Sequence, residues 1–166
     1  MAFAVTHVLI PMILVDLVRD HFFKEKKRFL PNKFIFFAGI AGLLPDIDIP
    51  ISYLLFGNLE LHRTITHTIW FPLAFFILFL YFYFANRKPF YYKFFLMLLI
   101  GFSFHLILDY GIIGTVSLLY PLTENVYGLN IFPISEMYLT YSALDAILLL
   151  LWLVHEEYEH KISDFF

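Results

Sequence analysis

The sequence predicts an all-α integral membrane protein, a single domain over residues 1–166 with about five membrane segments. Two features of the composition lead to this prediction. Hydrophobic residues make up 61% of the chain and charged residues 15%, an apolar share that a water-soluble domain of 166 residues could hardly bury. Phenylalanine occurs 22 times and tyrosine 11 times, a density typical of lipid-facing helices and of aromatic belts at membrane surfaces. A third feature, apolar runs separated by short polar loops, locates the segments.

Each segment is bounded by charged residues, proline or glycine. The first is short and contains Pro11, and the second stops at Pro45-Asp46-Ile47-Asp48-Ile49-Pro50, beyond which a further apolar run reaches Phe56. Because proline interrupts helices, Asp46 and Asp48 are expected on a turn at the membrane surface. Residues 111–136, rich in glycine, proline and polar residues, are expected to form a long loop or a re-entrant piece. The segments are expected at residues 2–18, 34–44, 68–85, from about 94 to 110, and 138–154.

Lysine and arginine predict the orientation, because they accumulate in short cytoplasmic loops. Ten of the 11 fall in residues 19–33, in residues 86–93 or at Lys161, and only Arg63 falls on the other side. The N-terminus is therefore expected outside and the C-terminus in the cytoplasm. The cluster Lys24–Arg28 is expected to bind anionic lipid headgroups, and it is too short and too close to the membrane for a nucleic-acid site. Three cytoplasmic histidines are expected to be solvated: His21, His155 and His160.

This orientation brings a set of ionisable side chains to the extracytoplasmic face. Ionisable groups at bilayer depth are rare unless they pair, line a cavity or hold an ion. Imidazoles with carboxylates are the ligands of zinc and related divalent metals, and the chain has no cysteine to offer thiolates. We therefore predict a site for one or two divalent ions, with zinc as the expected metal. The predicted ligands are His7, Asp46, Asp48, His62, His67, His105 and Asp109.

The spacing of these residues suggests individual roles. His105 and Asp109 are four residues apart, which places both side chains on one face of a helix. Of the two histidines before the third segment, His62 is favoured as a ligand and His67 as a supporting hydrogen-bond partner. An ion with an open coordination position lowers the pKa of a bound water to about 7. The candidate catalytic residues are Asp46 and Asp48, either of which could be base or ligand, and Arg63, which could contact a phosphate oxygen or simply reach a lipid headgroup.

Four sequence blocks, taken in order, resemble one family. They are Thr6-His7 with Leu9-Ile10-Pro11, then Gly42-Leu43-Leu44-Pro45-Asp46-Ile47-Asp48, then His62-Arg63-Thr64 with Thr66-His67, and finally His105-Leu106-Ile107-Leu108-Asp109. This pattern is similar to the YdjM-like family of membrane-bound metal-dependent hydrolases, also described as LexA-binding inner-membrane-associated hydrolases. The resemblance covers roughly residues 1–122. It implies a small prokaryotic protein of the cytoplasmic (inner) membrane with several helices and a hydrolase activity.

A more distant similarity is to the zinc-dependent phospholipases C. Those enzymes use a histidine near the N-terminus, a Pro-Asp followed by a histidine, and a His-x-x-x-Asp helix. This likeness implies that His7, Asp46 or Asp48, His62, His105 and Asp109 bind metal, with Asp109 as a possible bridge between two ions. The phospholipases also use a later His-x-x-x-Glu. His155 and Glu159 have that spacing but are expected on the cytoplasmic side, so we do not include them.

Together, the residues and the resemblance predict a membrane-bound metal-dependent hydrolase of a phosphoester or phospholipid-like substrate. Water activated by the metal would attack the substrate at headgroup depth, on the extracytoplasmic face. Membrane lipids and the substrate are the expected partners, and nucleic acid is not. The sequence leaves open the substrate, the bond cleaved, the number of ions and the oligomeric state.

Other functions stay open at this point. The same ligands could bind a metal for transport or sensing, or hold the helices together as a structural site closed by four ligands. A transport path should carry polar residues through the cytoplasmic halves of the segments, and the third and fifth segments have almost none there. The chain could also anchor a cytosolic partner through Lys24–Arg28.

Overall fold

The computed structural model describes residues 4–22, 30–59, 62–113, 115–129, 131 and 137–160, and these residues confirm the all-α prediction. The described residues contain six α-helices and no strand beyond one isolated bridge, between Val116 and Tyr127. A short 3₁₀ turn, Pro45–Ile47, precedes α4, and π-helical turns continue α5 over Tyr81–Asn86 and α6 over Asp109–Ile113. The helices are α1 (Ala4–Phe22), α3 (Asn32–Ala41), α4 (Asp48–Phe56), α5 (Trp70–Leu80), α6 (Pro89–Leu108) and α7 (Met137–His160).

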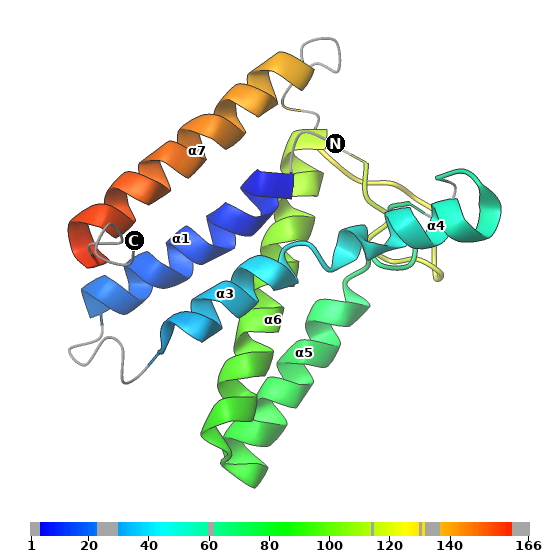
Figure 1. Ribbon diagram of the computed structural model, residues 1–166. Coiled ribbons are helices and arrows are strands. Elements are labelled where there is room, and N and C mark those ends of the chain that lie inside the picture. The colour runs from blue at the N-terminus through cyan, green and yellow to red at the C-terminus, as the bar shows by residue number, and fades with distance from the viewer. Residues whose placement is uncertain are drawn as a thin grey trace.

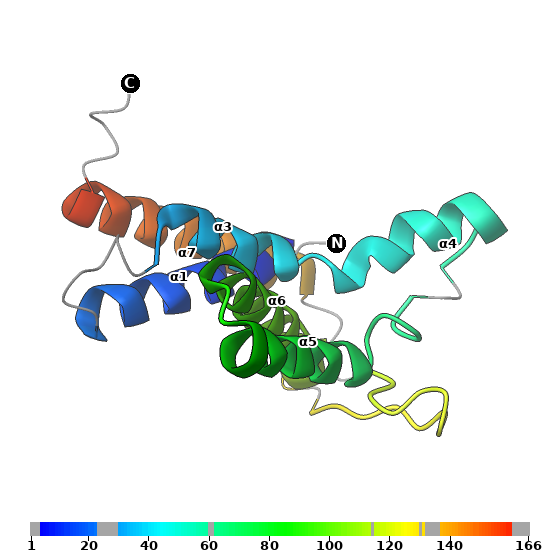
Figure 2. The same ribbon diagram turned by 90° about the horizontal axis from the view of Figure 1, so that it is seen from below.

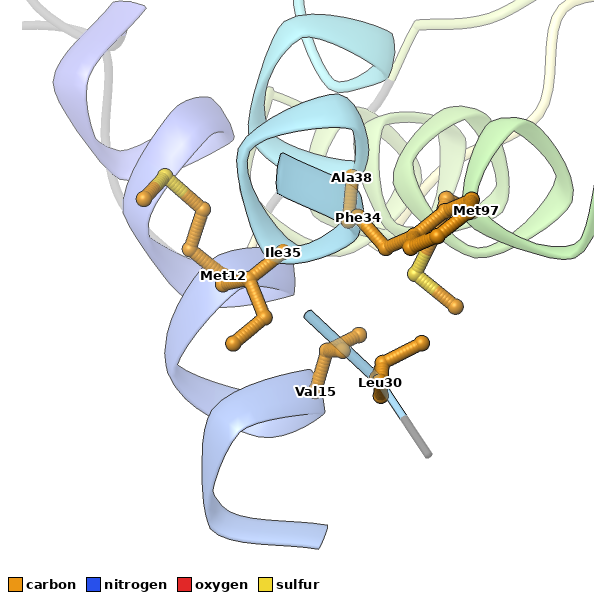
Figure 3. Close-up of a cluster of buried hydrophobic side chains, with 7 residues drawn as sticks. All are labelled: Met12, Val15, Leu30, Phe34, Ile35, Ala38 and Met97. Carbon is orange, nitrogen blue, oxygen red and sulfur yellow. The ribbon is translucent and has the colours of Figure 1, made fainter. Parts of the chain in front are cut away.

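The main apolar core lies between α1, α3 and α6, which pack around the centre of the molecule (Figure 1). Met12 of α1, Phe34 of α3 and Met97 of α6 belong to one buried cluster, in which Phe34 lies next to Met97 and Met12 lies next to Ile35 (Figure 3). Burying side chains of this size removes apolar surface from solvent and holds the three helices together. The cluster consists of Met12, Val15, Leu30, Phe34, Ile35, Ala38 and Met97.

Two glycines allow these helices to approach closely. A Cβ atom added to Gly42 would lie 2.0 Å from the carbonyl oxygen of His7, and one added to Gly101 would lie 2.2 Å from the carbonyl oxygen of Ala38. Contacts this short with backbone atoms cannot be relieved by a side-chain rotation. Small residues at helix crossings are a common device of membrane bundles, since they let backbones meet. Here they bring the end of α3 against both α1 and α6.

The remaining helices surround this centre. α5 and α6 run side by side in opposite directions (Figure 1), with stacked rings such as Phe71 on Phe102 and Phe82 on Phe95 between them. α7 lies along α1 and runs parallel to it, as contacts ten residues apart on both helices demonstrate: Thr6 with Asp145, and Asp16 with His155. α4 projects away from the bundle in both views (Figures 1 and 2).

The five predicted membrane segments are not confirmed. Among the described residues one helix, Pro89–Ile112, is long and apolar enough to cross a membrane. A second candidate is the pair Asn32–Ala41 and Pro45–Phe56, whose halves are bent by 51°. The apolar helix that begins at Trp70 is shorter, and α1 carries Asp16, Arg19 and Asp20 in its last turns. The predicted runs 2–18 and 138–154 nevertheless correspond to α1 and α7, and residues 115–129 of the predicted loop form no α-helix.

Candidate metal centre

The seven predicted ligands come together where α1, the bend after α3, the segment before α5 and the end of α6 meet. The two aspartates of the bend lie in neighbouring elements, and the histidines come from three different parts of the chain. His7 lies on α1, Asp46 in the 3₁₀ turn, Asp48 at the start of α4, His62 and His67 in the segment between α4 and α5, His105 on α6 and Asp109 directly after it. Residues separated by up to 102 positions in the chain thus contact one another.

Four side chains, Asp46, His67, His105 and Asp109, form the inner quartet of this centre. Nε2 of His67 lies 3.1 Å from Nε2 of His105. Oδ1 of Asp46 lies 3.5 and 3.6 Å from these two nitrogens, and Oδ2 of Asp109 lies 3.4 and 3.6 Å from them. Two ligands of a tetrahedral zinc ion, each bonded at about 2.1 Å, are roughly 3.4 Å apart. The donor atoms therefore already have the spacing of a coordination shell.

Hydrogen bonds on the far side of each imidazole direct its Nε2 atom into the quartet. Nδ1–H of His105 donates to the carbonyl oxygen of Gly42 over 2.6 Å. Nδ1 of His67 lies 3.2 Å from Oδ2 of Asp48 and 3.1 Å from the hydroxyl of Thr66, which itself donates to Asp48. In a neutral ring with a protonated Nδ1, Nε2 carries the lone pair. In many metal sites, hydrogen bonds of this kind to the second ring nitrogen fix the orientation of the imidazole.

Two lone pairs that face each other at 3.1 Å require a positive charge between or beside them. Burial alone would lower the pKa of His67, but hydrogen bonds to the carboxylates of Asp109, Asp46 and Asp48 outweigh it and raise the pKa to about 10. A proton on His67 or a divalent cation in the quartet can therefore satisfy the same group of atoms. The donor set of two imidazoles and two carboxylates fits zinc or manganese.

His7 contacts the other oxygen of Asp109. Its Nε2 lies 3.2 Å from Oδ1 of Asp109, and its ring lies 4.2 Å from the ring of His105, centroid to centroid. Asp109 therefore turns one oxygen towards His7 and the other towards the quartet, as a bridging carboxylate does. One ligand atom from each of His7, His105 and Asp109 also lies within 4.8 Å of the others, so these three side chains offer an alternative position for an ion. The single lone pair of His105 Nε2 can serve only one of the two positions.

Asp48 accepts four hydrogen bonds and organises the segment between α4 and α5. Its Oδ1 pairs with Nδ1 of His62 over 3.0 Å, and its Oδ2 accepts from the backbone N–H of Arg63, from Thr66 and from His67. With both oxygens engaged, this carboxylate positions other groups. Of the two acids left open by the sequence, Asp46 is the one that faces the quartet.

The structure buries His67 more deeply than His62. The side chain of His67 is completely buried in the quartet, whereas that of His62 is 22% exposed at the rim. The two rings meet edge to face, 5.3 Å apart. One ligand atom from each of Asp46, His62 and His67 lies within 4.8 Å of the others, so His62 borders the centre without entering it as deeply.

Arg63 lies beside the centre, and its backbone is held in an unusual conformation. Its φ angle is 64°, in the left-handed region that non-glycine residues rarely adopt. The bond from its N–H to Asp48 and one from its Nη1 to the hydroxyl of Thr115, 3.0 Å long, hold it there. Its Nε lies 3.6 Å from Oδ2 of Asp109, is buried, and has no hydrogen-bond partner among the described residues. Strained backbone of this kind is common at functional sites.

Three contributors to the centre were not predicted as such. The carbonyl of Gly42 is a backbone group, and its direction depends on the fold and not on the residue type. Thr66, which lies beside His67, donates a hydrogen bond to Asp48. Thr115 supports Arg63 across 52 residues of chain, and nothing in its neighbourhood indicated this contact.

Comparison with known proteins agrees with the first of the two resemblances. The family described as YdjM inner membrane protein matches residues 1–162, which include all seven predicted ligands. Comparison with curated proteins and with solved structures found no match, so the likeness to zinc-dependent phospholipases C has no support. The match indicates a protein of the inner membrane and covers almost the whole chain. The chain therefore belongs to the YdjM inner membrane protein family.

Proposed function

We propose that this protein is a membrane-bound metal-dependent hydrolase of a phosphoester or phospholipid-like substrate. The observation that carries the proposal is the inner quartet, in which two imidazole nitrogens and two carboxylate oxygens lie 3.1 to 3.6 Å apart. Zinc is the ion that suits these donors best. A bound ion would supply a Lewis acid and a water molecule of lowered pKa, which the side chains alone cannot provide.

Asp46 is the proposed base. Its side chain is 21% exposed, whereas the other three members of the quartet are almost completely buried. It is therefore the carboxylate that an entering water molecule can reach, and it can accept the proton of that water. His7 and Asp48 have supporting roles: His7 holds Asp109 in place, and Asp48 holds His67.

Arg63 is the proposed phosphate ligand. Its side chain is 24% exposed and its guanidinium lies beside Asp109, where its buried Nε has no hydrogen-bond acceptor among the described residues. An arginine can donate two parallel hydrogen bonds to a phosphate and stabilise the negative charge that develops during hydrolysis. A carboxylic ester would use this donor less fully, so the proposal favours phosphoesters.

The proposed location is the extracytoplasmic face of the inner membrane, with the N-terminus outside and the C-terminus in the cytoplasm. The cation asymmetry of the sequence supports this orientation. The parallel course of α1 and α7 is consistent with it, because both helices then run inwards. The centre lies at the end of α6, so a lipid-like substrate could reach it by lateral diffusion.

The test is metal content and activity of the detergent-purified protein. We expect stoichiometric zinc or manganese in the wild type and its loss in His105→Ala and Asp109→Asn. We expect turnover of bis(p-nitrophenyl) phosphate or a short-chain phospholipid to fall about 100- to 1,000-fold in Arg63→Ala, which keeps the ion. His21→Ala is the control, because His21 is exposed and far from the centre. A wild type that is purified without chelator, holds no metal and is no more stable than the variants would contradict the proposal.

A structural metal site is the second candidate, and one observation favours it. Four protein donors are enough to close a tetrahedral zinc ion, as in structural sites. The variant Asp46→Asn separates the two functions. A hydrolase should keep its ion in this variant and lose turnover. A structural site should show no turnover in the wild type, and removal of its ion or of Asp46 should lower the melting temperature.

A further inference from the structure

A second cluster of ionisable side chains lies at the opposite end of α1 and takes no part in the proposed hydrolysis. Asp16 follows His7 by nine residues, or roughly 13 Å along the helix. The cluster joins α1 to the start of α3 and to the last third of α7, which lies alongside α1 (Figure 1). Its members are Asp16, Arg19, Asp20, Asn32, His155 and Glu156.

Arg19 is completely buried and uses all three of its nitrogens within this cluster. Its Nη2 donates to Oδ1 of Asp16, its Nε to Oδ1 of Asp20 over 2.9 Å, and its Nη1 to Oδ1 of Asn32 over 2.7 Å. The guanidinium therefore holds one defined oxygen of each aspartate. This leaves Oδ2 of Asp16 directed towards α7.

Oδ2 of Asp16 meets His155 in the interior. The side chain of Asp16 is 1% exposed, and its Oδ2 accepts no hydrogen bond among the described residues. Nε2 of His155 lies 3.4 Å away and also has no hydrogen-bond partner there. His155 was expected to be solvated, and instead it turns its Nε2 to a buried carboxylate. A carboxylate oxygen without a donor is costly to bury and is a strong ligand for a cation.

Carboxyl groups also lie next to one another in this cluster. Glu156, next to His155, interacts with Asp16 as well, so that two carboxyl groups meet. Asp16 and Asp20 in turn hold the same guanidinium, that of Arg19. Adjacent carboxylates repel each other unless a proton or a metal ion lies between them. One ligand atom from each of Asp16, Asp20 and His155 lies within 4.8 Å of the others.

We propose that Asp16, Asp20 and His155 form a second divalent-cation site, which fastens α7 to α1. The donors, two carboxylates and one imidazole, suit Mn²⁺ and related ions that accept oxygen ligands. The two aspartates would bridge the ion and Arg19, each with one oxygen. In this arrangement, occupancy of the site determines how firmly the C-terminal helix is held against the bundle. The site is independent of the proposed hydrolase function.

The first experiment counts Mn²⁺ in detergent-purified protein that has been stripped with chelator, reloaded with Mn²⁺ and desalted. We expect His155→Gln to hold one ion fewer than the wild type, and His105→Ala to lose only the ions of the first centre. The double variant should hold none. His21→Gln is the matched control, because it removes an exposed histidine from the same end of α1. The proposal is overturned if His155→Gln keeps the full wild-type content.

The second experiment leaves the cluster intact and so does not depend on the folding of a variant. In the His105→Ala background, Mn²⁺ at about ten times its dissociation constant should raise the melting temperature by roughly 4 °C. The same addition should have no effect on His105→Ala/His155→Gln. A network held only by ion pairs and a shared proton would not respond to Mn²⁺ in either protein, and that result contradicts the proposal. Loss of Mn²⁺ in His155→Gln but not in His105→Ala would leave this site standing and overturn the proposed hydrolase centre.

Discussion

At the scale of single residues, the candidate centre depends on groups that would not contact a bound ion. Asp48 accepts hydrogen bonds from His62, Arg63, Thr66 and His67, and thereby sets the direction in which His67 presents Nε2. Such supporting groups commonly contribute ten- to 100-fold to metal affinity, about as much as a poor ligand does. The distinction between a ligand and its support is therefore testable.

The substitution Asp48→Asn should lower zinc affinity about ten- to 100-fold, whereas His105→Ala should abolish binding. The asparagine side chain keeps one oxygen acceptor, but its NH₂ group replaces the other oxygen and would point at groups that themselves donate hydrogen bonds. Competition with a chromophoric chelator measures both affinities. Glu124→Gln, a carboxylate-to-amide change at an exposed position, should have no effect. Equal loss in Asp48→Asn and His105→Ala would make Asp48 a direct ligand.

The raised pKa of His67 predicts how the centre responds to pH. Because the pKa is raised from 6.5 to about 10, the metal-free protein holds a proton on this ring at neutral pH. That proton stabilises the metal-free fold fully below pH about 6.5, and its contribution disappears as the pH rises towards 10. An incoming ion must displace it, so metal affinity should increase up to about tenfold for each pH unit between pH 7 and 9.

Titration calorimetry in buffers of different ionisation enthalpy measures this linkage directly. We expect about one proton to be released for each ion bound at pH 7.5. Asp48→Asn removes one of the carboxylates that raise the pKa of His67, so the release should be smaller in that variant. A binding constant that does not change between pH 7 and 9 would show that His67 stays neutral.

The sequence predicted which residues lie close together in the candidate centre but not their arrangement. His7, Asp46, His105 and Asp109 could be predicted because histidines and acids within apolar segments are costly and therefore rare. The order of His62 and His67 could not be predicted, because the rotation of the connecting segment decides which ring enters. That rotation depends on Arg63 with its positive φ and on Asp48, 14 residues before His62.

At the scale of elements, the bend between α3 and α4 creates the site. A straight helix through Pro45 would carry Asp46 and Asp48 past the other ligands, whereas the 51° bend turns them back to α6. The prolines predicted an interruption here, but the angle results from packing against α1 and α6. Gly42, at the end of α3, is where that packing is closest.

Gly42→Ala should therefore destabilise the protein by about 1–3 kcal/mol and weaken metal binding. The added Cβ would lie 2.0 Å from the carbonyl oxygen of His7, so α1 and α3 must separate. The carbonyl of Gly42 then moves away from Nδ1 of His105, which loses its orientation. Thermal unfolding in detergent and zinc content are the measurements. Gly111→Ala is the matched control, because a Cβ there meets nothing within 4 Å. The same melting temperature for both variants would contradict the close contact.

The number of membrane segments shows what hydropathy alone leaves undetermined. The apolar runs at 2–18, 68–85 and 138–154 do become helices, so their positions were predictable. Whether each crosses the membrane depends on its neighbours: α1 pairs the charges of its last turns with α3 and α7, and α5 rests on α6. α4 exposes apolar side chains such as Leu54, which is 82% exposed, and together with α3 it forms the bent pair that is the second candidate span.

At the scale of the whole molecule, the remaining question is which membrane face carries the centre. The span Pro89–Ile112 has 24 residues, or roughly 36 Å of helix, enough for a hydrocarbon core of about 30 Å. Lys88 lies at its beginning. Residues 115–129 lie at its end, where the N–H of Leu129 bonds to the carbonyl of Tyr110 beside the centre. If α6 crosses the membrane, its two ends lie at opposite membrane faces, and labelling each end identifies the face that carries the centre.

The absence of cysteine makes this orientation directly measurable, because every introduced thiol is the only one in the chain. Both Lys88 and Glu124 are exposed, and each can be replaced by cysteine without disturbing a buried contact. In intact cells with a permeable outer layer, a membrane-impermeant maleimide should label Glu124→Cys at once. It should label Lys88→Cys only after the inner membrane is opened, since the cations of that end are expected to face the cytoplasm. The cysteine-free wild type gives the background. The reverse pattern would place the metal centre at the cytoplasmic face, where its substrate would be a cytosolic phosphoester or an inner-leaflet lipid, and the cation asymmetry would then need another cause.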